Sequence, residues 1–172
     1  MRRTLPAVLF SLALTVSAQA SDLSGGYSFE RSKSADGPSV NRHGWNASVA
    51  IGLTGPVSLV ADAGGHYGSS EGVDGSQLTL MGGPRLSFLR GDKYAPFVQA
   101  LVGLLRETAS VQVLDVTISE SENRLGMLFG GGLDVKVSAR WIVRLEGDYE
   151  RSSKSGDSRS GFRLGVGAAY RF

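Results

Sequence analysis

The chain has 172 residues, of which 24 are glycine and none is cysteine, and its formal net charge is +2. This length fits one domain. The lack of cysteine excludes disulfides, thiolate metal sites and a lipoprotein anchor. A nearly neutral chain without a basic tract gives no electrostatic reason to expect nucleic acid as a partner.

The first twenty residues have the pattern of a secretory signal peptide. Met1-Arg2-Arg3 is basic, Leu5 to Val16 is apolar, and Ala18-Gln19-Ala20 fits the small-x-small cleavage pattern. We therefore predict a signal peptide over 1–20 and one domain over 21–172. Removal of the signal peptide would take away two of the 18 basic residues and no acidic one. The remaining basic residues would then equal the 16 acidic residues in number, which gives a net charge of zero.

The remainder reads as eight segments in which apolar residues recur at every second position, the period of a β-strand. The predicted strands are Leu23 to Arg31, His43 to Leu53, Val57 to Gly68, Ser76 to Leu89, a fifth from about Tyr94, a sixth that ends near Val137, Arg140 to Arg151, and Gly161 to Phe172. This pattern predicts an all-β fold, an eight-stranded antiparallel up-and-down transmembrane barrel.

The connections alternate between tight turns and polar loops, as they do in barrels of this kind. Thr54-Gly55-Pro56 is a tight turn. The predicted long loops are Ser32 to Arg42, Ser69 to Gly75, Thr108 to Glu122 and Ser152 to Ser160. The period of two continues through the third loop, so we expect the fifth and sixth strands to extend as an exposed ribbon. Pro84 cannot donate to a ladder, which predicts a bulge near Gly82-Gly83-Pro84.

The last strand indicates which face meets lipid. Phe162, Leu164, Val166, Ala168, Tyr170 and Phe172 alternate with Gly161, Arg163, Gly165, Gly167, Ala169 and Arg171. One face is apolar without interruption, and aromatic side chains favour the membrane interface. The predicted interface aromatics are Tyr27, Trp45, Tyr67, Trp141, Tyr149, Tyr170 and Phe172.

The chain ends on Phe172, two residues after Tyr170, and this ending resembles the C-terminal assembly signal of bacterial outer-membrane barrels. The resemblance is nearest to the small eight-stranded barrels of the OmpA-domain, OmpX and opacity-protein type. It implies a monomer in the bacterial outer membrane, inserted by the barrel-assembly machinery and surrounded by outer-membrane lipid and lipopolysaccharide. It also implies a non-enzymatic envelope role, structural or adhesin-like, with host or cell-surface ligands at the external loops.

Charged residues of both signs fall on the predicted inner face. They are Glu30, Asp62, Arg85, Glu107, Arg124, Asp134, Lys136, Arg144, Glu146, Asp148, Glu150, Arg163 and Arg171. Because an eight-stranded barrel is just wide enough for side chains to fill, we expect these charges to pair inside the lumen. A narrow pore is the alternative interpretation, and single-channel recording distinguishes the two.

Two further alternatives remain open. A soluble lipocalin-like barrel would turn the apolar face inward around a small ligand. A lipid A-modifying enzyme would need a nucleophile and a base at the rim, for which His66 and Ser69 are the candidates. The two histidines lie far apart, so no metal site is predicted, and no cofactor motif is recognised.

Overall fold

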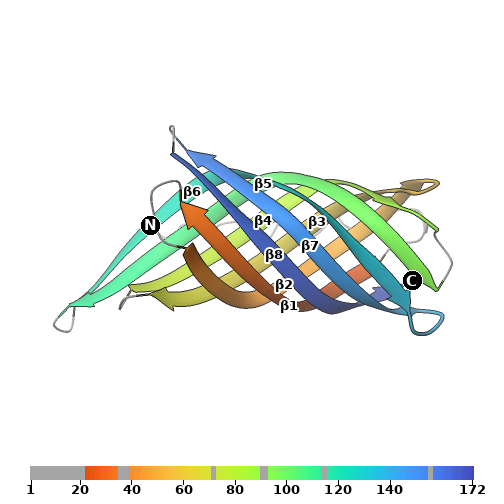
Figure 1. Ribbon diagram of the computed structural model, residues 1–172, viewed down its shortest axis with the longest axis horizontal. Coiled ribbons are helices and arrows are strands. Elements are labelled where there is room, and N and C mark those ends of the chain that lie inside the picture. The colour runs from red at the N-terminus through yellow and green to blue at the C-terminus, as the bar shows by residue number, and fades with distance from the viewer. Residues whose placement is uncertain (1–21, 35–38, 71–72, 90–92, 114–115, 155–156) are drawn as a thin grey trace, which may run out of the picture.

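The computed structural model is a single closed β-barrel (Figure 1). It describes residues 22–34, 39–70, 73–89, 93–113, 116–154 and 157–172, so the predicted signal peptide lies outside the described residues. The strands are β1 (Asp22–Ser34), β2 (Ser39–Thr54), β3 (Val57–Ser70), β4 (Val73–Ser87), β5 (Tyr94–Val113), β6 (Val116–Lys136), β7 (Trp141–Lys154) and β8 (Asp157–Arg171). Each pairs antiparallel with the next, and β8 pairs with β1 to close the wall. No helix in the described ranges has the length and apolar character needed to cross a membrane.

The alternation of side chains separates an apolar outer wall from a largely polar interior. On β7, Trp141, Val143 and Leu145 are exposed, whereas Arg144 and Glu146 are buried. The same division holds on β8, where Leu164 is exposed and Arg163 is buried. The eight-stranded membrane-type barrel is thereby confirmed. The lipocalin-like alternative is wrong, because it requires these apolar side chains to point inward.

The two ends of the barrel differ, and we name them by what they carry. At the terminal end β1 begins, β8 ends, and Asp22 pairs with Arg171. At the opposite end, the ribbon end, the hairpin of β5 and β6 projects furthest, as the green and turquoise strands show in Figure 1. This hairpin stays in register up to the Val113–Val116 pair, whereas β7 pairs with β6 only as far as Leu125. The predicted pairing of the fifth and sixth strands through this segment is confirmed.

The four long loops that the sequence predicted at the ribbon end are largely strand. β1 continues to Ser34 and β2 begins at Ser39, so most of the predicted first loop is paired. The same holds for the second and fourth, where β3, β4, β7 and β8 extend into the predicted loops, while the third is the paired hairpin of β5 and β6. The loop prediction was wrong for the first, second and fourth segments, which carry mostly small and polar residues on both faces. They continue the ladder through backbone hydrogen bonds, for which side-chain alternation gives no signal.

The predicted bulge at Gly82-Gly83-Pro84 is also absent from the described register. The ladder between β4 and β5 lacks two pairs there but resumes with Arg85 opposite Gln99 in unchanged register. A Cβ atom at Gly83 would overlap the carbonyl oxygen of Ala100, so the missing side chain lets the strands stay close beside the proline. The register shift that the structure does contain lies at Gly52–Thr54, beside the predicted tight turn.

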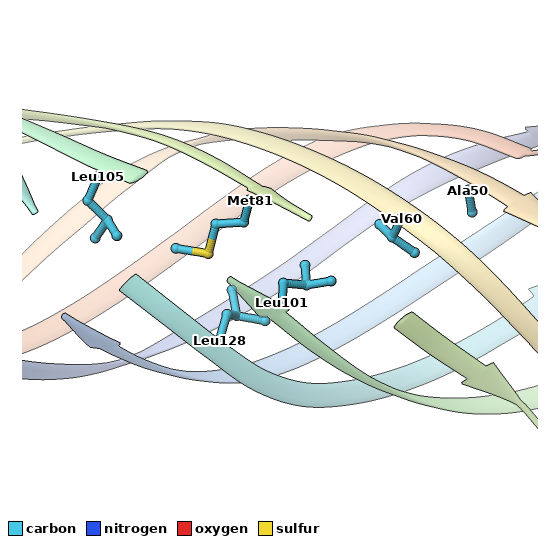
Figure 2. Packing of buried hydrophobic residues seen from close by; sticks show 6 residues of the cluster. All are labelled: Ala50, Val60, Met81, Leu101, Leu105 and Leu128. Carbon is cyan, nitrogen blue, oxygen red and sulfur yellow. The ribbon is translucent and has the colours of Figure 1, made fainter. Parts of the chain in front are cut away.

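Part of the lumen is apolar, which the predicted charge network did not include. Figure 2 shows a buried cluster contributed by β2, β3, β4, β5 and β6, made of Ala50, Val60, Met81, Leu101, Leu105 and Leu128. Gly126 makes room for it, because a Cβ atom there would overlap Leu105 and press on Met81. The apolar cluster fills the lumen where β3 to β6 form the wall.

Candidate functional site

The most deeply buried cation of the lumen is Arg163 on β8. Its side chain is 1% exposed and holds two carboxylates from other strands. Nη1 donates to Asp62 of β3 at 2.8 Å, while Nε and Nη2 donate to one oxygen of Asp148 of β7 at 3.1 and 3.0 Å. These charge-assisted bonds tie β8 to β3 across the lumen and to β7 beside it.

A second cluster lies towards the terminal end. Arg144 donates from Nε and Nη2 to the two oxygens of Asp134, at 2.7 and 2.8 Å, in the bidentate arrangement that guanidinium groups favour. Its Nη1 lies 3.2 Å from Asp22. The guanidinium groups of Arg85 and Arg144 also lie 4.5 and 5.3 Å from the ring centroid of Phe97, so the buried aromatic ring contacts both cations.

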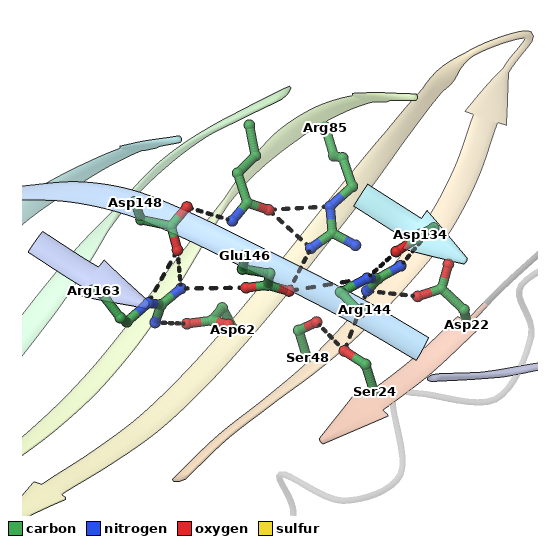
Figure 3. A network of polar contacts seen from close by, with 11 residues as sticks. Asp22, Ser24, Ser48, Asp62, Arg85, Asp134, Arg144, Glu146, Asp148 and Arg163 are labelled. Carbon is green, nitrogen blue, oxygen red and sulfur yellow. Dashed lines mark hydrogen bonds and ion pairs between the residues drawn. The ribbon is translucent and has the colours of Figure 1, made fainter. Parts of the chain in front are cut away.

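Glu146 links the two clusters. Its carboxylate oxygens lie 3.9 Å from nitrogen atoms of Arg85, Arg144 and Arg163. Figure 3 shows this carboxylate between the three guanidinium groups, with Asp148 and Asp62 on one side and Asp134 on the other. Gln99 completes the link, because it accepts from Arg85 at 2.8 Å and donates to Asp148 at 3.0 Å. The lumen charges at the terminal end and in the middle of the barrel therefore form one connected network.

A third cluster closes the lumen towards the ribbon end, around Glu107 of β5. Its carboxylate lies 2.6 Å from Arg159, 3.5 Å from Arg124 and 3.9 Å from Arg42. Arg124 also donates to Glu122 at 2.9 Å. Arg42 and Arg159 are not among the predicted lumen charges, because both fall inside or at the edge of predicted loops. Continuing the period of two beyond the apolar residues would have placed both on the inner face.

Arg42 also connects this cluster to residues deeper in the barrel. It donates to Ser32 at 2.9 Å and to Gln77 at 3.1 Å, and it lies 3.5 Å from Glu30. Gln77 in turn donates to Glu150 at 3.1 Å. Glu30 and Glu150 are thus held inside the lumen by partners on β2 and β4.

His66 is the predicted candidate for a catalytic base, and it lies inside the barrel. Its Nε2 makes a 2.9 Å hydrogen bond with Ser28 Oγ, and its Nδ1 lies 3.5 Å from Glu30. A hydroxyl, an imidazole and a carboxylate are therefore adjacent, as a nucleophilic site requires. However, Ser28 and His66 are both 0% exposed, so no substrate reaches them in this conformation. The other candidate, Ser69, belongs to β3, but its side chain lies outside the described residues.

Two members of the predicted charge network lie at its margin. Lys136 and Arg171 are half-buried at the terminal end of β6 and β8. Within the part of the chain that the structure describes, no ion pair joins Arg171 to the other lumen charges. Both positions are close to the end of the wall. Among the described residues, no group of three or more histidine and carboxylate side chains could hold a metal ion.

The predicted interface aromatics lie on the outer wall in two groups. Near the terminal end, Trp141 stacks edge-on against Tyr170 at 5.2 Å, and Tyr170 lies 6.2 Å from Phe172. The second group lies further towards the ribbon end and comprises Tyr27, Trp45, Tyr67 and Tyr149, all exposed. Tyr27 is hydrogen-bonded to His43, and Tyr149 contacts Phe162 edge-on at 5.3 Å. Two aromatic belts with an apolar band between them are the arrangement of a membrane-spanning barrel.

The lumen is packed rather than open. A cavity lined by Ser24, Asn46, Arg144 and Glu146 has a volume of about 10 Å³. That is roughly the space of a single water molecule. With ion pairs on one side and the apolar cluster on the other, the interior resembles a protein core more than a channel.

Comparisons with known proteins agree with this geometry. No family model matches the chain, and no curated protein matches it in sequence. Solved structures do match. Ail, the attachment invasion locus protein of Yersinia pestis, matches with a TM-score of 0.65 and 20% identity, over 89% of this chain and 98% of Ail. Neisserial surface protein A matches with a TM-score of 0.72 and 16% identity over 90% of this chain and 99% of its own.

The outer membrane protein OprG of Pseudomonas aeruginosa matches with a TM-score of 0.63 and 11% identity, over 90% of this chain and 96% of OprG. Ail has also been solved in complex with the heparin analogue sucrose octasulfate, and that structure matches at 22% identity with a TM-score of 0.64, over 89% of this chain and 98% of that one. The fold is therefore that of the small eight-stranded outer-membrane barrels, and the resemblance drawn from the sequence is confirmed at this level.

Proposed function

We propose that the chain is a non-enzymatic protein of the bacterial outer membrane, which anchors a ligand-binding ribbon end outside the cell. The observation that carries this proposal is the contrast between a filled lumen and a projecting hairpin. The lumen is occupied by buried ion pairs and by the apolar cluster. The hairpin of β5 and β6 extends beyond the neighbouring strand β7. The hairpin offers surface for binding a ligand, whereas the filled lumen offers no path for a solute.

The outer wall supports the membrane placement. Large apolar side chains such as Leu80, Leu104 and Leu125 are more than half exposed, which is costly in water and favourable in lipid. Ail and OprG, which share the fold, are proteins of the outer membrane. With both chain ends on the periplasmic side, the ribbon end faces outward. The aromatic pair of Tyr170 and Phe172 at the end of β8 then serves as the assembly signal.

Sulfated polysaccharide is the first ligand class to test, because Ail forms a complex with a heparin analogue. The register of the hairpin allows a clean truncation. Ala109 pairs with Glu120, so replacing residues 110–119 by an Asn-Gly turn shortens both strands equally. We expect cells that display the truncated protein to lose at least tenfold of their binding to heparin-coated surfaces, at unchanged amounts of inserted barrel.

Electrophoresis with and without boiling measures the inserted barrel, since closed barrels migrate compactly until they are heated. The matched control replaces the turn between β2 and β3, Gly55-Pro56, at the terminal end by Asn-Gly. Two results would contradict the proposal. One is truncated protein that inserts and binds as the parent does. The other is a purified protein that gives large, stable single-channel steps.

A further inference from the structure

Two neighbouring carboxyl groups on the inner face of β7 are compensated very differently. Asp148 lies 3.0 Å from Arg163 and accepts two hydrogen bonds from its guanidinium group. Glu150, the next inward residue, is also buried, but its Oε1 accepts only one hydrogen bond, from the neutral amide of Gln77 at 3.1 Å. Its Oε2 is buried without a hydrogen-bond partner, and no ion pair joins Glu150 to a cation within the described ranges. Burying an ionised carboxylate in this way is strongly unfavourable.

The contact that leads from Glu150 towards a cation passes through Gln77 to Arg42 of β2. Gln77 Oε1 accepts a hydrogen bond from Arg42 Nη1 at 3.1 Å, so the amide nitrogen is the atom that faces Glu150. Arg42 itself lies 3.5 Å from Glu30 and 3.9 Å from Glu107. Its charge is therefore divided between two other carboxyl groups, and the amide of Gln77 separates it from Glu150.

The remaining strands around Glu150 supply no uncommitted cation among the described residues. On β8, Gly161 pairs with Glu150 and has no side chain, while Arg163 already donates to two aspartates. The charged groups that interact with Glu150 are Arg163, Glu30 and Glu107, and the latter two oppose a negative charge on it. The groups that contact these three in turn are Arg42 and His66 at Glu30, Arg42, Arg124 and Arg159 at Glu107, and Asp62 and Asp148 at Arg163.

Towards the ribbon end the described lumen therefore holds one carboxyl group more than its arginines compensate. The glutamates here are Glu30, Glu107, Glu122 and Glu150, and the arginines are Arg42, Arg124 and Arg159. A proton is the smallest ligand that removes the excess charge without changing the packing. We propose that Glu150 binds a proton in the folded barrel, on its unpartnered Oε2, and that this proton keeps Arg42 near Glu107 at the base of the hairpin of β5 and β6.

The proton acts as a latch for the hairpin. When it leaves, the ionised Glu150 competes with Glu107 for Arg42, because opposite charges attract strongly in a buried site. Glu107 pairs in register with Glu122, so two acids lie directly opposite each other where the hairpin leaves the barrel. Like charges in that arrangement destabilise a strand pair. Loss of Arg42 from Glu107 therefore loosens the base of the hairpin.

Infrared spectroscopy of the protein folded into lipid vesicles detects the proton, because a protonated carboxyl group and a carboxylate absorb at different frequencies. At neutral pH, we expect the difference spectrum between the parent and Glu150→Gln to contain the band of a protonated carboxyl group. The matched control is Glu122→Gln, which removes a glutamate that lies 2.9 Å from Arg124. Its difference spectrum should contain only carboxylate bands.

Amide hydrogen exchange then tests the latch. Buried glutamates lose their protons at about pH 8–9. After correction for the intrinsic effect of pH, we expect exchange in the hairpin of β5 and β6 to accelerate about tenfold between neutral and alkaline pH in the parent. Glu150→Gln cannot ionise, so its hairpin should keep the slow exchange. Compact migration before boiling shows that each variant is a closed barrel.

Three results would overturn the proposal. One is a Glu150→Gln difference spectrum with carboxylate bands only, which would mean that Glu150 is ionised. Another is a protonated-carboxyl band that disappears in Glu30→Gln but not in Glu150→Gln. The third is hairpin exchange that does not respond to pH in the parent, or responds equally in Glu150→Gln. None of these measurements uses a ligand of the ribbon end, so they remain decisive even if heparin does not bind.

Discussion

Strands β5 and β7 show how differently one barrel can fill its interior. The inner face of β7 carries Arg144, Glu146, Asp148 and Glu150, all buried and all with polar partners. The inner face of β5 instead carries the buried apolar residues Phe97, Leu101 and Leu105, although its Gln99 and Glu107 reach the charge clusters. Both faces are closed to water, yet one depends on compensated charge and the other on apolar packing. Removing a partner on the β7 side therefore leaves an uncompensated charge in the interior, whereas removing a side chain on the β5 side opens only a void.

The largest effect is expected where charge compensation is most complete. Arg163→Met keeps much of the side-chain volume but leaves Asp62 and Asp148 buried without their cation. Breaking a buried pair in this way costs about 3–5 kcal/mol of unfolding free energy. The measurement is urea unfolding of the protein folded into lipid vesicles, followed by the fluorescence of Trp45 and Trp141 on the outer wall.

The matched control for this prediction is Arg159→Met. Arg159 is 32% exposed at the ribbon end, and Glu107 keeps Arg124 and Arg42 nearby when it is removed. Solvent screens such a site, so the expected loss is under about 1 kcal/mol. Equal losses in the two variants would show that burial does not set the cost of removing a charge from this lumen.

The next largest loss of unfolding free energy is expected in the apolar cluster. Leu128→Ala removes a side chain that is 0% exposed within the apolar cluster. The lost transfer energy and the cavity left behind together cost about 2–4 kcal/mol. Leu125→Ala, on the same strand but 60% exposed on the outer wall, should cost clearly less, because lipid fills the space. Similar losses at the two positions would mean that the cluster is not tightly packed.

The same contrast between β5 and β7 explains how much of the fold the sequence could predict. On β7, charged residues recur at every second position from Arg144 to Glu150, so the strand, its faces and these inward charges follow from the period of two. On β5, Leu101 and Leu105 face inward while Val102 and Leu104 face outward. Because both faces are apolar here, the alternation does not distinguish the inner face from the outer one. It therefore does not predict that this part of the lumen is apolar.

The ribbon end was harder still to predict. Around Ser32 and Arg42 neither face is apolar, and strand formation there depends on pairing with a neighbouring strand rather than on local pattern. The local pattern therefore places Arg42 at the edge of a loop and does not predict its contacts with Glu30 and Gln77. The partners of His66 likewise depend on register. Ser28 and His66 lie opposite the same residue of β2, Gly44, which no periodicity within one strand reveals.

The smallest effect concerns the glycines that shape the inner wall. At Gly126, an added Cβ atom would overlap Leu105 and force that flexible side chain to move. Overpacking of this kind costs about 1–2 kcal/mol. At Gly147 of β7, which faces outward, an added Cβ atom would lie 3.6 Å from Leu164, an ordinary contact. Gly126→Ala should therefore lower the free energy of unfolding in vesicles. Gly147→Ala should leave it unchanged or raise it slightly, because alanine has less freedom to lose on folding. Loss of stability at Gly147 but not at Gly126 would contradict the packing described for the β5 side.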